Sequence, residues 1–261
     1  SSTIFNDKLL GGKRVTIIGL GALGSEVGKS LARNAVGHFN LFDNDTFEIG
    51  NSVRHAADLF YIGENKVEVV KQLIQRSNPN ITVNSYCLDV LDDNGQLEKS
   101  LLNSDLCLVL TGEDSVDYLL NDKYITNFHI SLIFARVSAG GLSGSVQIVN
   151  HNSSCLRCLS KRGLDYLPKP KTDIQYSELK PEYGSCSAPA VPGSEIDTKE
   201  VALQVSRVAL QVLLANENAN YSQLLGSQYY WHGPFGSSEQ PPFTWEIKDY
   251  PKDKVCSICS Q

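Results

Sequence analysis

Three closely spaced glycines are the first residues in this sequence whose types and spacing could do chemistry. Gly19, Gly21 and Gly24 form a Gly-x-Gly-x-x-Gly pattern between a short apolar run, Arg14–Gly19, and a stretch with helical periodicity. Glycines at this spacing permit a tight turn and let a phosphate approach the free N–H groups at the start of the helix. The pattern predicts nucleotide binding, with a plain tight turn as the alternative. By itself it does not separate a nicotinamide cofactor from ATP.

Charged and amide side chains follow the next apolar run, His38–Asp43. Asp43 and Asp45 stand where a carboxylate can accept hydrogen bonds from ribose hydroxyls. An amide and two cations come next: Asn51, Arg54 and Lys66. A guanidinium and an ammonium suit negative charge that develops on a phosphoryl oxygen, whereas a dehydrogenase has no task for them. The alternative interpretation is a solvated loop and helix.

Two Cys-x-x-Cys pairs lie far apart in the chain: Cys155 with Cys158, and Cys256 with Cys259. Four thiolates complete a tetrahedral zinc shell and leave no open position for catalysis. The spacing therefore predicts a structural Zn²⁺ site that ties a long polar region to the C-terminal tail. A redox dithiol pair and unpaired surface thiols are the alternatives.

The other cysteines call for separate interpretations. Cys186 lies in a long polar segment just before a predicted helix, and an exposed thiol there becomes a nucleophile where nearby groups stabilise its thiolate. An incidental loop cysteine is the alternative. Cys87 and Cys107 fall in predicted strands, and we expect both to pack in the core.

The elements that must position these residues alternate between strand and helix. Apolar runs predict strands at 105–110 and 129–136, and helical periodicity predicts helices at 64–78, 115–126 and 198–214. This alternation is typical of an α/β fold, a Rossmann-like doubly wound and mostly parallel sheet with helices on both faces. Residues 150–195 are polar and rich in proline, which predicts a long crossover loop. Two aromatic strands and the zinc-clipped region close the chain.

Composition narrows the class of protein further. The 261 residues are 41% hydrophobic and 20% charged, enough for one large α/β domain or two small ones. A net charge of −6 argues against nucleic acid or a membrane as the main partner. Because no membrane span or signal peptide is evident, we expect a cytoplasmic protein, where a disulfide framework is not favoured. The sequence contains no methionine, which favours a domain cut from a longer protein.

Taken in order, the motifs resemble those of the E1/ThiF/MoeB superfamily, and within it the prokaryotic E1 (ThiF-type) domains of E2/E1/deubiquitinase-type operons, some of them antiviral. The similarity covers roughly 14–79 and includes Ile62–Lys66 and the Asn78-Pro79 pair. It implies one adenylation domain over residues 1–261. ATP would be bound by the three glycines, its ribose by Asp43 and its phosphates by Asn51, Arg54 and Lys66. Relatives also carry a magnesium-associated aspartate. Glu113 occupies that position by register, and Asp114 follows it.

The resemblance implies ATP-dependent adenylation of the C-terminal carboxylate of a ubiquitin-like protein, then a thioester on Cys186. The partners it implies are a ubiquitin-like protein with a C-terminal glycine, an E2-like protein and a second copy of the chain. Many relatives supply an arginine from a short N-terminal helix. The N-terminal segment of this sequence has no such arginine, so either Lys8 substitutes for it or the arginine lies upstream. The alternatives are a sulfur-carrier adenylyltransferase, an NAD-dependent oxidoreductase and an inactive partner-binding module.

Overall fold

The described residues of the computed structural model form one mixed eight-stranded sheet. These residues are 7–124, 130–150, 153–171, 195–215 and 226–259. The strands lie in the order β3-β2-β1-β4-β5-β6-β7-β8. Their bounds are β1 Arg14–Ile18, β2 His38–Phe42, β3 Thr82–Tyr86, β4 Leu106–Val109, β5 Ser131–Val137, β6 Ser143–Val149, β7 Gln228–His232 and β8 Thr244–Lys248.

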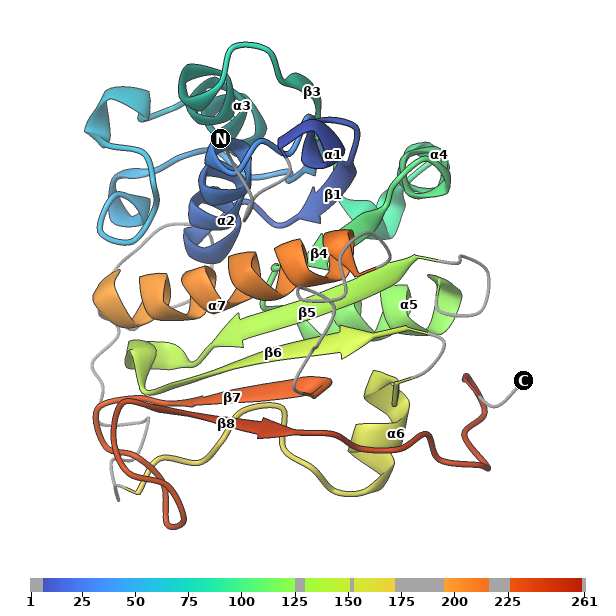
Figure 1. Ribbon diagram of the computed structural model, residues 1–261. Helices are drawn as coiled ribbons and strands as arrows, with labels where there is room; N and C mark the ends of the chain where they lie inside the picture. The colour runs from blue at the N-terminus through green and yellow to red at the C-terminus, as the bar shows by residue number, and fades with distance from the viewer. Residues whose placement is uncertain (1–6, 125–129, 151–152, 172–194, 216–225, 260–261) are drawn as a thin grey trace.

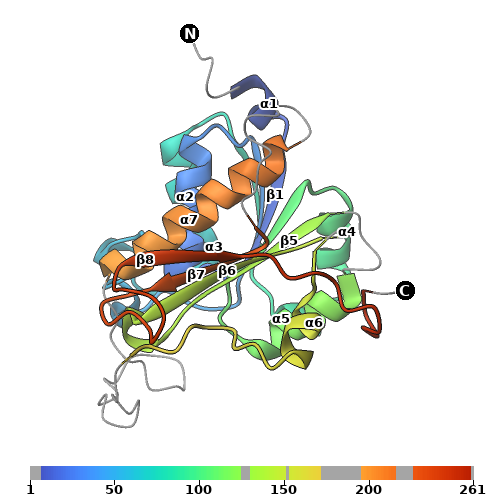
Figure 2. The same cartoon turned by 60° about the horizontal axis from the view of Figure 1, so that its bottom comes forward.

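Helices cover both faces of this sheet (Figures 1 and 2). One apolar core lies under α2, α3 and α7, and the other lies under α4, α5 and α6. The helices are α1 Asp7–Gly11, α2 Ala22–Arg33, α3 Lys66–Ser77, α4 Gln96–Leu102, α5 Asp114–Tyr124, α6 Leu156–Lys161 and α7 Glu195–Leu214. Short 3-10 turns are η1 Ile49–Asn51, η2 Leu59–Tyr61, η3 Val90–Asp92 and η4 Ala139–Gly141.

The direction of the strands determines where a ligand can bind. β1 to β5 pair in parallel, whereas the neighbouring pairs β5–β6, β6–β7 and β7–β8 are antiparallel. The chain runs outward from β1 through β2 to β3 and then returns to place β4 on the other side of β1. In open α/β sheets, ligands bind outside the carboxyl ends of the strands at such a switch point. The predicted α/β, Rossmann-like and mostly parallel fold is confirmed.

Helix periodicity explains how the first units pack. Val67, Val70 and Ile74 follow one another on the core side of α3 at three- and four-residue steps. Gly28 of α2 faces Val70 and Ile74, and a Cβ there would meet them at 3.5 and 3.4 Å, in ordinary van der Waals contact. α3 ends before Pro79, because the residue preceding a proline is driven out of the helical region.

Two expectations from the sequence need correction. Cys107 is buried on β4, as expected, but Cys87 is exposed, because β3 ends at Tyr86 on the edge of the sheet. The segment expected to be a loop from 150 to 195 contains α6, whose apolar residues pack in the core under α5. Cys186 lies outside the described residues. None of the described helices is both long and apolar enough to cross a bilayer.

Candidate active site

A cavity of about 330 Å³ opens at the switch point between β1 and β4. Its walls come from the carboxyl ends of β1, β2, β4 and β5 and from the segments that follow them. This volume lies within the range of small-molecule sites. Predicted residues that line it are Gly19, Gly21, Asp43, Asp45, Arg54, Lys66 and Glu113.

The glycine turn needs its glycines for different reasons. Gly19 has a φ of +86°, and a Cβ there would lie 2.7 Å from the backbone nitrogen of Thr111. A Cβ on Gly24 would collide with the carbonyl oxygen of Gly19, and Gly24 therefore lies beneath the turn and does not line the cavity. Gly21 lines the cavity, and a Cβ there would meet no atom within 4 Å. Gly19 and Gly24 therefore shape the turn, and Gly21 leaves room above it.

Asp43 holds the glycine turn in place. Its Oδ2 accepts the N–H of Leu20 at 2.6 Å, and its Oδ1 accepts the N–H of Asp45 at 2.8 Å. Burial raises the pKa of Asp43 above its ordinary value, while the Leu20 N–H and the charge of Lys66 oppose that rise. Each oxygen retains a lone pair for a further donor, such as a ribose hydroxyl.

The segment after β2 folds back and brings two cations to the cavity. Thr46 pairs with Asn65 in an isolated antiparallel bridge, which places Lys66 beside Asp45. The Nζ of Lys66 lies 2.7 Å from Oδ2 of Asp45, and its side chain is only 9% exposed. Arg54 lines the same cavity, and within the described ranges its guanidinium makes no hydrogen bond or ion pair. One cation is therefore pre-positioned by a carboxylate, and the other is available for an anionic ligand.

His55 is a positioning residue that the sequence did not indicate. One ring nitrogen, Nε2, lies 2.9 Å from the carbonyl oxygen of Leu20, and Nδ1 accepts the N–H of Ala57. Nε2 must therefore carry the proton and donate it. Burial lowers the pKa of His55 to about 4, so the ring is neutral near pH 7. The His55 ring holds the Arg54 segment against the glycine turn. In the sequence, the only indication of this role is that His55 directly follows Arg54.

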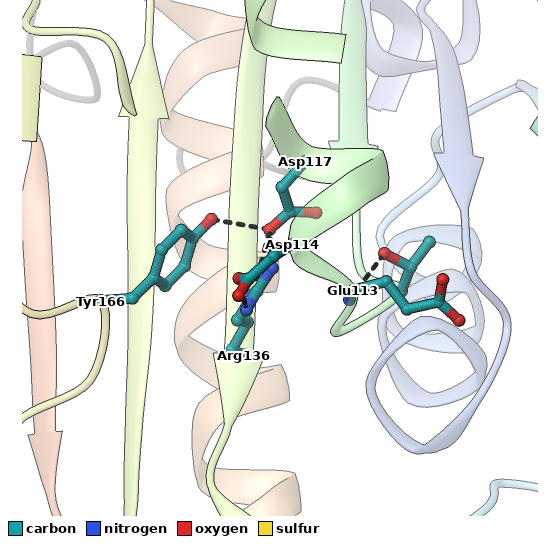
Figure 3. Close-up of polar contacts among 6 residues, drawn as sticks. Glu113, Asp114, Asp117, Arg136 and Tyr166 are labelled. Atoms are coloured by element: carbon teal, nitrogen blue, oxygen red, sulfur yellow. Dashed lines mark hydrogen bonds and ion pairs between the residues drawn. The ribbon is translucent and has the colours of Figure 1, made fainter. Parts of the chain in front are cut away.

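Glu113 and Asp114, which the sequence left as alternative magnesium ligands, point in different directions (Figure 3). Asp114 forms an ion pair with Nη1 of Arg136. Glu113 lines the cavity, and its carboxylate makes no hydrogen bond or ion pair with the residues that the structure describes. Glu113 is therefore the carboxylate that is available to a cation in the cavity.

Arg136, Asp117 and Tyr166 form a cluster with Asp114 that sequence reasoning missed (Figure 3). Asp117 Oδ2 accepts hydrogen bonds from Nε and Nη2 of Arg136, at 3.0 and 2.7 Å, and from the Tyr166 hydroxyl at 2.8 Å. The guanidinium carbon lies 4.2 Å from the centre of the Tyr166 ring. Burial raises the pKa of Asp117, and the neighbouring guanidinium opposes the rise. No short sequence pattern links these residues, because they come from β5, α5 and the segment after α6.

Asn51, which we predicted to contact phosphate, lies in the turn η1 that precedes Arg54. Its side-chain oxygen accepts the N–H of Glu48 at 2.9 Å and closes a capping box at η1. Asn51 does not line the cavity. Its amide stabilises the turn that precedes Arg54, so phosphate contact by Asn51 stays a prediction.

The four cysteines come together on the face covered by α5 and α6. The Sγ distances are 3.8 Å for Cys155–Cys158, 3.7 Å for Cys155–Cys256 and 3.3 Å for Cys158–Cys259. All four Sγ atoms lie within 4.8 Å of one another, and all four residues are buried. A tetrahedral shell with Zn–S bonds of about 2.3 Å has edges of about 3.8 Å. The cluster has the donor set and size for structural zinc.

Fold and cavity together define a Rossmann-like α/β protein with a nucleotide-type turn and a cationic wall at the switch point. The chain belongs to the ThiF family, whose model matches residues 6–226. The predicted membership of the E1/ThiF/MoeB superfamily is confirmed.

Several known proteins resemble the chain. The Sinorhizobium fredii protein y4qC is 28% identical over 82% of this chain and 39% of its own. The Yarrowia lipolytica adenylyltransferase and sulfurtransferase UBA4 is 24% identical over 95% of this chain and 55% of its own. The chain thus spans about half the length of these relatives or less. The crystal structure of Escherichia coli MccB with ATP superposes with a TM-score of 0.70 at 20% identity, covering 97% of this chain and 68% of that one. At this identity, the match with MccB supports the fold alone.

Proposed function

We propose that this chain uses ATP to adenylate the C-terminal carboxylate of a ubiquitin-like protein and then forms a thioester on Cys186. The observation that carries the proposal is the convergence of Arg54, Lys66 and Glu113 on one cavity above the glycine turn. Membership of the ThiF family supports an adenylyltransferase over an NAD-dependent oxidoreductase. The Arg54 guanidinium, which lines the cavity and meets no partner among the described residues, speaks against an inactive binding module.

In the first step, an oxygen of the substrate carboxylate attacks the α-phosphorus of ATP. The bond from that phosphorus to the bridging oxygen breaks, and pyrophosphate leaves. Lys66 and Arg54 would balance the charge on the phosphates, so alignment and electrostatics suffice without a protein nucleophile. Glu113 would help to hold Mg²⁺, which when bound neutralises part of the triphosphate charge.

In the second step, the Cys186 thiolate would attack the acyl carbon of the adenylate. A thioester forms and AMP leaves with the electron pair of the broken acyl–phosphate bond. The relative UBA4 is named an adenylyltransferase and sulfurtransferase and aligns over 95% of this chain, which favours a sulfur-carrier protein as a second candidate substrate. The first step would be the same for both candidates.

The first test is ATP–pyrophosphate exchange against a panel of small proteins that end in Gly-Gly. Arg54→Ala and Lys66→Ala should each lower exchange by about a hundredfold, the usual effect of removing one preorganised charge from a phosphoryl site. Lys71→Ala is the matched control, because Lys71 lies on the same helix and contacts Glu68 and Ser85 instead of the cavity. Circular dichroism checks that each variant is folded. Exchange that persists in both cavity variants would rule out the proposed adenylation site.

Cys186→Ala separates the two steps. It should leave exchange intact and abolish the thiol-labile adduct on the chain, detected by gel shift with and without a reducing agent. A thiol-labile adduct that persists in Cys186→Ala shows that Cys186 is not the nucleophile. With an added sulfane-sulfur donor, a mass increase of one sulfur atom on intact protein would instead support the sulfur-carrier candidate.

We further propose that the chain acts as a homodimer through the exposed apolar residues that flank Arg54. The segment holds Ile49, Val53, Leu59, Phe60 and Ile62, and Phe60 is 81% exposed. Monomers rarely leave so many large apolar side chains together in water. Light scattering should give a dimer for the wild type and a monomer for Phe60→Asp. A monomeric wild type would exclude this interface.

A further inference from the structure

Arg136, on β5, is a cationic residue of the cavity wall. The ATP chemistry proposed above gives it no role. It lies at the carboxyl end of β5 and lines the cavity, whereas Asp114 and Asp117 do not. Its side chain is 11% exposed, and Asp117 beneath it is 1% exposed. A guanidinium with so little exposure to water needs ion-pair partners. One role for Arg136 is therefore structural, through its ion pairs. Because Arg136 also lines the cavity, a second role in binding a ligand is indicated.

The pair with Asp117 aims the guanidinium. Nε and Nη2 both donate to Oδ2 of Asp117, and the Tyr166 hydroxyl donates to the same oxygen. The ring of Tyr166 packs on the guanidinium plane. These contacts hold the Nε side, so the Nη1 and Nη2 end is the part left for another anion. One N–H on each of these two nitrogens meets no acceptor within the described ranges.

Asp114 occupies part of that end. Its carboxylate meets Nη1, yet its side chain is 72% exposed and makes no other hydrogen bond or ion pair with the described part of the chain. A guanidinium end of this kind pairs with carboxylates in a two-point geometry. Asp114 therefore shows which chemical group the free end of Arg136 accepts, and its exposure makes it exchangeable for a carboxylate from solution.

The position of Arg136 also fits the acyl substrate and not the nucleotide sugar. Asp43, the candidate ribose ligand, ends β2, and β5 lies three strands away across β1 and β4. At about 4.8 Å per strand, this separation is about 14 Å. Arg136 thus lies at the opposite end of the cavity from the ribose. A substrate carboxylate bound at the Arg136 end would be held there before it attacks the α-phosphorus.

We propose that Arg136 is a specificity-determining residue that binds the C-terminal carboxylate of the substrate, with Asp114 as the internal carboxylate that the substrate displaces. This inference rests on the proposed function, since it names the residue that recognises the acyl substrate of that same site. Asp117 and Tyr166 act as positioning residues that hold the guanidinium.

The test compares two synthetic heptapeptides that end in Gly-Gly, one with a free carboxylate and one with a carboxamide. Calorimetry measures their binding to the folded chain in the presence of magnesium and a non-hydrolysable ATP analogue. The wild type should bind the carboxylate at least about tenfold more tightly, because a charge-assisted pair discriminates by about that factor. Asp114→Asn should strengthen carboxylate binding severalfold and leave amide binding unchanged.

Arg136→Gln combined with Asp117→Asn should abolish the preference without leaving a buried carboxylate unpaired. Arg136→Lys should restore part of it, which a purely structural role would not predict. Asp122→Asn is the matched control for Asp114→Asn: Asp122 lies on the same helix, pairs with Arg157 and does not line the cavity. Equal wild-type affinity for the two peptides, or a preference that survives in the double variant, overturns the inference.

The outcome is separable from that of the proposed function. Peptide binding in this assay needs no bond to form or break. Absence of pyrophosphate exchange in the wild type would therefore count against adenylation and leave a measured carboxylate preference standing. Conversely, normal exchange with no carboxylate preference would sustain adenylation and remove Arg136 from substrate recognition.

Discussion

A buried neutral histidine joins the two halves of the candidate ATP site. His55 is 6% exposed and bridges the Leu20 carbonyl and the Ala57 N–H. Its pKa is lowered by burial from 6.5 to about 4, so the unfolded chain binds the proton more readily than the folded one. This contribution to stability is complete above pH 6.5 and is lost as pH falls towards 4.

We therefore expect the free energy of unfolding to fall by about 2 kcal/mol between pH 7.5 and pH 5 because of His55 alone. Urea titrations at the two pH values measure it. His55→Gln should be less stable at pH 7.5 but should show a loss on acidification that is smaller by that amount. An identical loss in wild type and variant would mean that His55 does not titrate in this way.

At the same scale, the residues that the sequence predicted share one property: each belongs to a local motif. Gly21, Arg54 and Lys66 were predicted because a phosphate site needs a glycine turn and nearby cations, and all three line the cavity. His55 and Arg136 were missed because their roles depend on partners from other elements, Leu20 for one and Asp117 for the other. A single side chain gives no local signal for such a contact.

The turn between β1 and α2 allows a prediction at the scale of an element. Gly24→Ala would force its Cβ into the Gly19 carbonyl, whereas the space around Gly21 is open and its φ of −72° is accessible to alanine. Gly24→Ala should therefore lower the unfolding free energy by about 3 kcal/mol, and Gly21→Ala by about 1 kcal/mol or less.

Function should respond differently to the same two changes. The Cβ of Gly21→Ala would enter the cavity, so we expect weaker ATP binding in a protein of nearly normal stability. Thermal unfolding with and without ATP measures both quantities. If Gly21→Ala keeps the full stabilisation by ATP, the nucleotide does not lie over this turn.

Elements with a strong local pattern were predicted, and those set by packing were not. The periodicity of α3 and α7 gave both helices within a few residues. The short helix α6 was hidden in a polar segment, since one and a half turns give little periodicity and its stability comes from contacts with the core. Cys87 was misplaced because the end of an edge strand depends on its neighbour and not on its own residues.

For the whole molecule, alternation of strands and helices predicted the parallel half of the sheet. The order of the strands, and the antiparallel pairing of β6, β7 and β8, depend on contacts between distant segments that composition and periodicity do not encode. The four cysteines were the exception. Two Cys-x-x-Cys pairs predicted contact between two distant segments, because four thiols together suit one tetrahedral metal shell.

The four-cysteine cluster should hold the C-terminal tail on the rest of the fold. Beyond β8 the tail has few large apolar side chains in a core, and it returns to α6, where Cys155 precedes the helix (Figure 1). We expect about one zinc per chain by mass spectrometry of the metal. Removing zinc with a chelator, or making Cys256→Ser, should lower the melting temperature by about 10 °C, since several kcal/mol of binding energy would be lost.

Cys87→Ser is the matched control for that change, because Cys87 is an exposed thiol outside the cluster. It should leave both the zinc content and the melting temperature unchanged. ATP–pyrophosphate exchange should survive loss of the metal at a temperature where the chain stays folded, because a complete Cys₄ shell has no open position for substrate. Zinc-free wild-type protein of unchanged stability would contradict a structural metal site, and the tail would then be held by protein contacts alone.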